Sequence, residues 1–105
     1  MARSHGETAP NTYVQDGDWP EAILRPEAPA SAHYAQELAR RLAAEMRRRP
    51  ISNRELARVA GVSHPTIGSV LNGDRYADLR TLASLEVALG AELYPAGMFQ
   101  RLRAT

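Results

Sequence analysis

Apolar side chains recur at three- and four-residue spacing along most of this chain after residue 30, which is the period of one helix face. The first stripe predicts a helix from Ser31, its expected N-cap, to about Arg48. Pro50 ends this helix because a proline disfavours helical backbone in the residue before it. The stripe consists of Ala35, Leu38, Ala39, Leu42 and Met46.

A shorter helical pattern covers residues 52–60. Ser52, with Glu55 three residues later, forms a capping box, in which the hydroxyl and the carboxylate each satisfy a backbone N–H of the first turn. Gly61 ends the pattern. The inward face of this helix is expected to consist of Leu56, Val59 and Ala60.

A third helix is expected over residues 63–72, only a short turn away from the second. Ser63 is its predicted N-cap. Pro65 falls in the first turn, where the missing N–H would have had no acceptor within the helix. The dipeptide Asn72-Gly73 ends the helix.

Two further helices complete the pattern. One runs from a cap at Asp78 to Gly90, with leucines at positions 79, 82, 85 and 89. The other is short, after Pro95, and contains Met98, Phe99 and Leu102. The sequence contains no internal repeat and no convincing strand, so we expect an all-α protein, a compact bundle of four or five helices.

Residues 1–30 differ from the rest of the chain. They hold four of the seven prolines and two glycines and have no helical period, which predicts an extended or partly disordered segment ahead of a domain over residues 31–105. A free tail seldom carries as much apolar surface as residues 13–24 do. These residues are therefore expected to pack on the domain or on a partner; the apolar ones are Tyr13, Val14, Trp19, Ile23 and Leu24.

Composition limits the class of protein. A length of 105 residues with 44% apolar side chains suits one small domain with a modest core. The absence of cysteine excludes disulfides and thiolate metal sites, and no run approaches the roughly 18 apolar residues of a membrane span. With no signal-peptide pattern at the start, we expect a cytoplasmic protein that has no contact with a membrane.

The net charge of +1 conceals an uneven distribution. Residues 1–30 carry two arginines against five carboxylates, whereas residues 31–76 carry eight arginines against four carboxylates. The positive excess thus lies around the second and third predicted helices, as is typical of a surface that binds phosphate groups.

Signals of an enzyme are lacking in the sequence. His5, His33 and His64 are far apart, and no pair of histidines has the spacing of metal ligands on one helix. No glycine-rich phosphate loop follows a strand, and no nucleophile elbow occurs. We therefore expect no catalytic activity, no metal and no cofactor.

The spacing within residues 52–73 is that of a helix-turn-helix, in which two helices cross steeply over a short turn. Close crossing requires a small residue in the first helix, which is Ala57. The turn requires a residue that tolerates positive φ, and Gly61 stands four positions later. Branched residues, Ile67 and Val70, then follow at the spacing needed to fill the core from the second helix.

At these residues the chain resembles the Xre-type helix-turn-helix family, the group of the phage lambda repressor and Cro proteins. The resemblance covers about residues 34–102 and rests on ELARVAGVSHPTIGSVLNG and DLRTLASLEVALG. It implies a lambda-repressor-like bundle of four or five helices. It also implies binding of duplex operator DNA as a homodimer, with the second motif helix in the major groove.

Carried onto matching positions, the resemblance implies two sets of contact residues. The exposed start of the second motif helix would read bases, with apolar contact only from the proline; this set is His64, Pro65, Thr66 and Ser69. Phosphate groups would be held from both sides of that helix by Asn53, Arg54, Asn72, Arg75 and Tyr76. Many members carry Gln or Arg at base-reading positions, whereas this chain has short side chains and an imidazole there, which predicts modest specificity or a dependence on DNA shape.

These observations predict a sequence-specific bacterial transcriptional regulator in the cytoplasm, associated with the nucleoid when bound to DNA. The alternative is an antitoxin or adaptor whose helix-turn-helix domain mainly binds another protein, with residues 1–30 as the contact. An N-terminal segment that packs on its own domain favours the regulator, and one that becomes ordered only on a partner favours the alternative.

Overall fold

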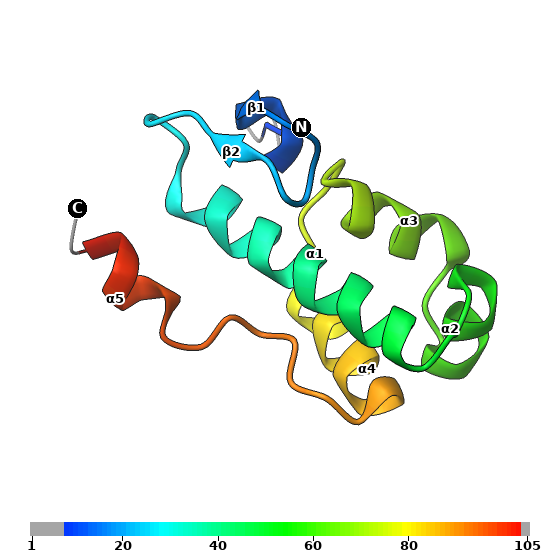
Figure 1. The fold of residues 1–105 in the computed structure, drawn as a ribbon. Coiled ribbons are helices and arrows are strands. Elements are labelled where there is room, and N and C mark those ends of the chain that lie inside the picture. Colours follow the sequence, from blue (N-terminus) through cyan, green and yellow to red (C-terminus); the bar gives the residue numbers. More distant parts are fainter. Residues whose placement is uncertain (1–7, 104–105) are drawn as a thin grey trace, which may run out of the picture.

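Residues 8–103 form five α-helices preceded by a short 3-10 helix and a small hairpin (Figure 1). The structure is a computed structural model that describes residues 8–103. In chain order the elements are the 3-10 helix η1 (Pro10–Tyr13), β1 (Val14–Asp16), β2 (Ile23–Leu24), α1 (Ala30–Arg48), α2 (Asn53–Ala60), α3 (His64–Asn72), α4 (Leu79–Leu89) and α5 (Met98–Arg103). The predicted all-α bundle with a mostly irregular N-terminal extension is confirmed.

Three of the predicted helix starts are capped as the sequence indicates. The side chains of Ser52, Ser63 and Asp78 accept hydrogen bonds from backbone N–H groups three residues later, at 3.1, 3.2 and 2.8 Å. In the capping box the Glu55 carboxylate pairs with Arg58 rather than with the Ser52 N–H. The expected cap at Ser31 is wrong, because α1 begins at Ala30 after Pro29 and has no side-chain cap.

The core is formed where α1 meets the other helices. Long α1 lies in the middle, with α2 and α3 on one side of it and α4 along another (Figure 1). Fully buried leucines and an isoleucine come from four different helices and from the segment after α4; they are Leu42, Leu56, Ile67, Leu85, Leu89 and Leu93. Together they form one continuous cluster, which is what a small single domain requires.

Two apolar residues of the predicted inward faces point to solvent instead. Val59 is 50% exposed and Leu79 is 78% exposed. A helical apolar stripe shows which face is buried only approximately, because its edges are covered or left open according to the size of the neighbouring residues. Here α4 faces α2 with small side chains, Ser84 and Ala88, which leave Val59 at the rim of a hollow.

The described part of the N-terminal segment packs on the helices. Strands β1 and β2 pair antiparallel, with Val14 opposite Leu24, so the expectation that the chain has no strand is wrong. Strands of two and three residues are too short to show an alternating pattern in the sequence. The buried Gln36 of α1 donates a hydrogen bond to the Ala22 carbonyl at 2.5 Å. Of the two alternatives for residues 13–24, packing on the domain is the one observed.

Glu37 holds two arginines of α1 that reach the N-terminal segment and the segment after α4. Its carboxylate accepts hydrogen bonds from Arg40 Nη1 at 2.8 Å and from Arg41 Nε at 3.1 Å. Arg40 Nε also lies 3.3 Å from the Glu21 carboxylate, and Arg41 Nη1 donates to the Tyr94 carbonyl at 2.8 Å. Burial raises the pKa of the Glu37 carboxyl, but the hydrogen bonds and positive charges of the two arginines outweigh it, so that this pKa lies below its ordinary value.

We expect Glu37→Gln to lower the free energy of unfolding at neutral pH by up to about 1 kcal/mol. Because the pKa is lowered in the folded state, the contribution is present above the ordinary titration range of glutamate and disappears as the pH falls below about 4. Urea denaturation of both proteins at about pH 7 and about pH 3 checks this. Glu92→Gln is the control, because Glu92 is exposed and belongs to no ion pair among residues 8–103. A Glu37→Gln difference that stays constant down to the lower pH would contradict the argument.

Candidate nucleic-acid interface

Helices α2 and α3 form the predicted helix-turn-helix, joined by residues 61–63. Gly61 has φ of +71°, a left-handed conformation that other residues adopt only with strain, and it ends α2. Ala57 is partly buried against the core, where a larger side chain would separate the two helices. Ile67 and Val70 of α3 are buried, so the opposite side of α3 faces solvent.

The predicted base-reading residues lie within the first six residues of α3. His64 and Pro65 are exposed, whereas Thr66 and Ser69 are half-buried. The Thr66 hydroxyl lies 2.7 Å from Ser63 Oγ, in the N-cap, and therefore shares its hydrogen-bonding capacity between the cap and any ligand. The first turn of α3 thus presents a short, uncharged surface to which only the imidazole adds reach.

The predicted phosphate contacts fall on two sides of α3. On one side, Asn53 begins α2 beside α3, where a Cβ on Gly68 would lie 3.9 Å from its side-chain nitrogen. Arg54 follows it and is exposed. On the other side, Asn72 ends α3 and Arg75 lies in the loop after it, both exposed.

Tyr76 is placed differently from the other members of this set. It is half-buried, and together with Tyr34 and Tyr94 it lines an apolar hollow beside α1. Its hydroxyl lies 3.2 Å from Ser31 Oγ at the start of α1. Tyr76 also lines a second hollow together with Asp74 and Arg75, and this is the surface that it shares with Arg75.

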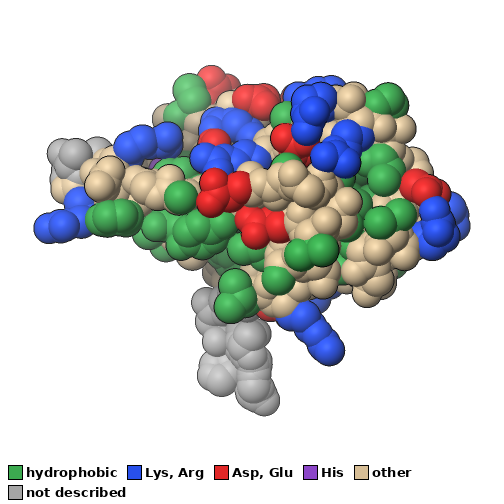
Figure 2. Space-filling view, turned by 90° about the horizontal axis from the view of Figure 1, so that it is seen from below, with side chains coloured by type: hydrophobic (Ala, Val, Ile, Leu, Met, Phe, Trp, Pro, Cys, Tyr) green, Lys and Arg blue, Asp and Glu red, His purple; other side chains and the backbone are tan. Residues whose placement is uncertain are grey.

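Intramolecular ion pairs reduce the number of arginines available to a ligand. Five of the eight arginines in residues 31–76 pair with carboxylates: Arg40, Arg41, Arg48, Arg49 and Arg58. Within the described part of the chain Arg47, Arg54 and Arg75 have no such partner. Figure 2, which shows the face at the bottom of Figure 1, has several blue side chains directly beside red ones. Arg54 and Arg75, one on each side of α3, lie next to the motif and form no direct ion pair within residues 8–103.

One basic residue of this surface was missed by the sequence reasoning. Exposed Arg80 lines a polar groove of about 590 Å³ between the motif turn and α4, and Thr66 lines the same groove. Asp78 lines the same groove. The pKa of its carboxyl lies below its usual range because the carboxylate accepts a hydrogen bond from the Thr81 backbone N–H and lies near the charges of Arg80 and Arg75. No sequence pattern marks Arg80, because only the packing of α4 against α2 brings it to this groove.

Residues 8–103 contain neither a cluster of metal ligands nor a helix that could span a membrane. No group of three or more His, Asp or Glu side chains in this range is placed to hold a metal ion. In the same range, no helix combines the length and apolar character needed to span a bilayer.

Comparisons with known proteins agree with this geometry. The helix-turn-helix family model matches residues 42–94, which contain α2, α3 and α4. Among solved structures, the restriction-modification controller protein C.AhdI from Aeromonas hydrophila is similar, with 26% sequence identity and a TM-score of 0.51 over 54% of this chain and 86% of that chain. A comparison with curated proteins gives no match.

If Arg54 and Arg75 hold phosphate, Arg54→Ala or Arg75→Ala should weaken binding to all duplex DNAs alike and reduce the slope of log affinity against log salt by about 1. Fluorescence anisotropy over a salt series checks this. Arg58→Ala is the matched control, because Arg58 lies on the same helix as Arg54 but pairs with Glu55. Equal losses in all three variants would contradict specific phosphate contacts and would indicate only a diffuse effect of charge.

Proposed function

We propose that this chain, which belongs to the Xre-type, lambda-repressor-like helix-turn-helix family of DNA-binding proteins, is a sequence-specific transcriptional regulator. In this proposal α3 enters the major groove of duplex DNA as part of a homodimer. The protein acts in the bacterial cytoplasm and is associated with the nucleoid when bound to its operator.

The observation that carries the proposal is the arrangement around α3. Its solvent side presents a polar first turn, and guanidinium groups that form no ion pair within residues 8–103 lie on both sides of it, at Arg54 and Arg75. A helix in the major groove needs uncharged or hydrogen-bonding groups toward the bases and positive groups toward the two phosphate backbones. The arrangement fits that requirement, and the controller protein to which the chain is similar supports a role in gene regulation.

Affinity and selectivity come from different residues in this proposal. Phosphate contacts of Arg54, Arg75 and backbone amides supply most of the affinity, which therefore depends on salt. Base contacts of His64, Thr66 and Ser69, with apolar contact from Pro65, supply the selectivity. Because no Arg or Gln makes a bidentate base contact from these positions, we expect modest discrimination with a contribution from DNA shape.

The N-terminal segment bears on the alternative role as an antitoxin or adaptor. That role predicts a segment that becomes ordered only on another protein. Residues 9–25 instead lie on their own domain, with Asn11 bonded to Gly73 and Gln36 bonded to Ala22. This packing supports the plain regulator.

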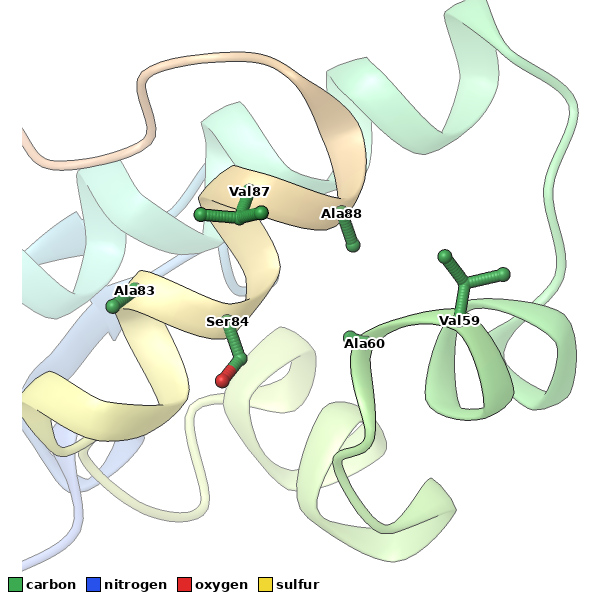
Figure 3. Close-up of a pocket in the computed structure, with 6 residues that line it drawn as sticks. All are labelled: Val59, Ala60, Ala83, Ser84, Val87 and Ala88. Atoms are coloured by element: carbon green, nitrogen blue, oxygen red, sulfur yellow. The ribbon is translucent and has the colours of Figure 1, made fainter.

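An exposed apolar face on α4 supports the homodimer. Leu79, Ala83 and Val87 repeat every four residues along α4, and Val87 is 82% exposed. Beside them α2 and α4 enclose a hollow of about 330 Å³, into which Val59, Ser84 and Ala88 project (Figure 3). A two-fold interface requires a surface that is complementary to itself, and this face carries both protruding branched side chains and a hollow to receive them. We therefore propose a second copy of the chain as its occupant.

The size of the domain suits such a pairing. Its principal extents are 37, 33 and 24 Å. In a two-fold dimer the two α3 helices lie apart by twice the distance of α3 from the axis, so half-sites about 34 Å apart require α3 to lie about 17 Å from the axis, a distance that fits within these extents. Each α3 could then enter the major groove on the same side of the duplex.

Selection of bound sequences from a random pool of duplex DNA tests the proposed function. We expect enrichment of a two-fold symmetric site whose half-sites lie about 10 base pairs apart. Against this site, Thr66→Ala with Ser69→Ala should relax the sequence preference while leaving the salt dependence nearly intact, because these side chains contact bases and not phosphate. If the double variant kept the wild-type preference, α3 would not be the reading helix.

If α4 forms the dimer interface, Val87→Glu should convert the protein to a monomer, because a carboxylate would be buried without a partner. Sedimentation equilibrium measures the change, and binding to the two-half-site DNA should weaken while the helical circular dichroism is retained. Ile23→Glu is the control, since Ile23 is also an exposed branched residue, at 60%, but lies in the hairpin. A Val87→Glu protein that remained dimeric would place the interface elsewhere.

A further inference from the structure

The C-terminal end of α3 is covered by a segment from outside the family match. Gly73 follows α3 with φ of +76°, and a Cβ built on it would lie 2.5 Å from Cε2 and 2.7 Å from Cδ2 of Trp19. The indole ring therefore lies directly on the Gly73 backbone, at a distance that no other residue at position 73 would allow. Gly61 has a similar φ of +71°, but its equivalent Cβ would meet nothing within 4 Å.

The same segment also binds the carbonyl groups that end α3. The last carbonyls of a helix have no partner within the helix. Here the Asn11 backbone N–H donates to the Gly73 carbonyl at 2.9 Å, and Asn11 Nδ2 donates to the Asn72 carbonyl at 3.0 Å. Asn11 Nδ2 also lies 2.8 Å from Asp74 Oδ1. Three consecutive residues, 72–74, are thus fixed by one side chain and its backbone.

Residues 9–25, which we name the N-terminal clamp, are themselves attached to α1. Pro10 is buried where η1 packs on α1. The Ala22 carbonyl accepts from Gln36, and Glu21 pairs with Arg40. The end of α3 is therefore connected through the clamp to the longest helix of the domain.

We infer that the N-terminal clamp positions the end of α3 and the loop after it for phosphate binding, with Trp19 and Asn11 as positioning residues. The inference rests on the proposed function, because the groups it positions are the predicted phosphate contacts Asn72 and Arg75. Asn72 is held directly through its carbonyl, and Arg75 follows the held residues 72–74. Neither positioning residue needs to contact DNA: Trp19 acts through Gly73, and Asn11 acts through the carbonyls of residues 72 and 73.

Trp19 makes this contact by packing of its indole and not by a hydrogen bond: a Cβ on Gly73 would lie 2.8 Å from Nε1 as well as close to Cε2 and Cδ2. Trp19 Nε1 is buried and has no hydrogen-bond partner among the described residues. A buried donor without a partner destabilises a fold, so hydrogen bonding does not explain the placement of the indole. A phenyl ring should therefore cover Gly73 as well, which makes Trp19→Phe the conservative variant and Trp19→Ala the disruptive one.

The test measures affinity of the full chain for the selected duplex and for a scrambled duplex over a salt series. We expect Trp19→Ala to weaken binding to both DNAs by about fivefold or more, a usual size for coupling between sites, and to flatten the salt slope. Trp19→Phe should restore affinity and slope, and Asn11→Ala should act in the same direction as Trp19→Ala. The inference would be overturned if a folded Trp19→Ala protein bound DNA with wild-type affinity. If Trp19→Ala does not fold, wild-type affinity of Asn11→Ala would overturn it instead. A Trp19→Phe protein that bound DNA as weakly as Trp19→Ala would also overturn it.

A second measurement needs no DNA. In a double-mutant cycle, Gly73→Ala should destabilise the wild type more than it destabilises Trp19→Ala, because removing the ring removes the collision. Gly61→Ala is the matched control: its effect should be the same in both backgrounds, since its backbone strain is similar and no side chain lies near. Additive effects at Gly73 would contradict the contact.

Hydrogen exchange separates failure of this inference from failure of the proposed function. The amides of Gly73 and Asp74 donate to the Val70 and Ser69 carbonyls, so they report directly on the end of α3. They should exchange faster in Trp19→Ala than in the wild type or Trp19→Phe, while the amides of α4 remain unchanged. If wild-type protein selected no DNA, the proposed function would fail, and unchanged exchange at these two amides would independently overturn the positioning role.

Discussion

The steep crossing of α2 and α3 is the constraint on which the rest of this molecule depends. It requires a left-handed residue at the turn, supplied by Gly61, and a small residue at the closest approach, supplied by Ala57. With those two conditions met, Leu56 and Ile67 are buried in one cluster with α1. The solvent side of α3 is then fixed, because the rotation of a short helix is determined once its buried residues are seated. A larger residue at position 57 would therefore alter the interface and the core together.

The charges of the domain act mainly within the chain and only secondarily toward a ligand. Most arginines of α1 and α2 lie three or four residues from a glutamate on the same helix, and such pairs form readily on a helix surface. The overall excess of positive charge is therefore a poor guide to which residues meet phosphate. What distinguishes Arg54, Arg75 and Arg80 is that each lies next to the motif and lacks a carboxylate partner among residues 8–103.

A small core explains why the N-terminal segment is integrated with the helices. The bundle relies on leucine, isoleucine and alanine, with almost no buried aromatic side chain, and so it has little surplus stability to hold a loosely packed helix end. Covering Gly73 with Trp19 and satisfying the α3 carbonyls with Asn11 adds buried contacts at the point where the chain leaves α3. The segment thereby extends the domain beyond the residues that the family model matches.

Local rules of the sequence were sufficient for the helices and most of their ends; the exception is the start of α1, which follows Pro29 without a side-chain cap. Three signals act over only a few residues: side-chain caps at Ser52, Ser63 and Asp78, left-handed glycines, and the helical apolar period. The five helices and the motif could therefore be predicted from the sequence. The residues proposed to contact DNA could be placed on α3 and beside it for the same reason. Which edge of an apolar stripe is covered could not be predicted, as Val59 and Leu79 show. Three further contacts are between residues far apart in the chain: Arg80 lies beside Thr66, Tyr76 packs against α1, and Trp19 covers Gly73. Only the tertiary structure decides such contacts, because they arise when separate helices and the hairpin pack together, and no local pattern records them.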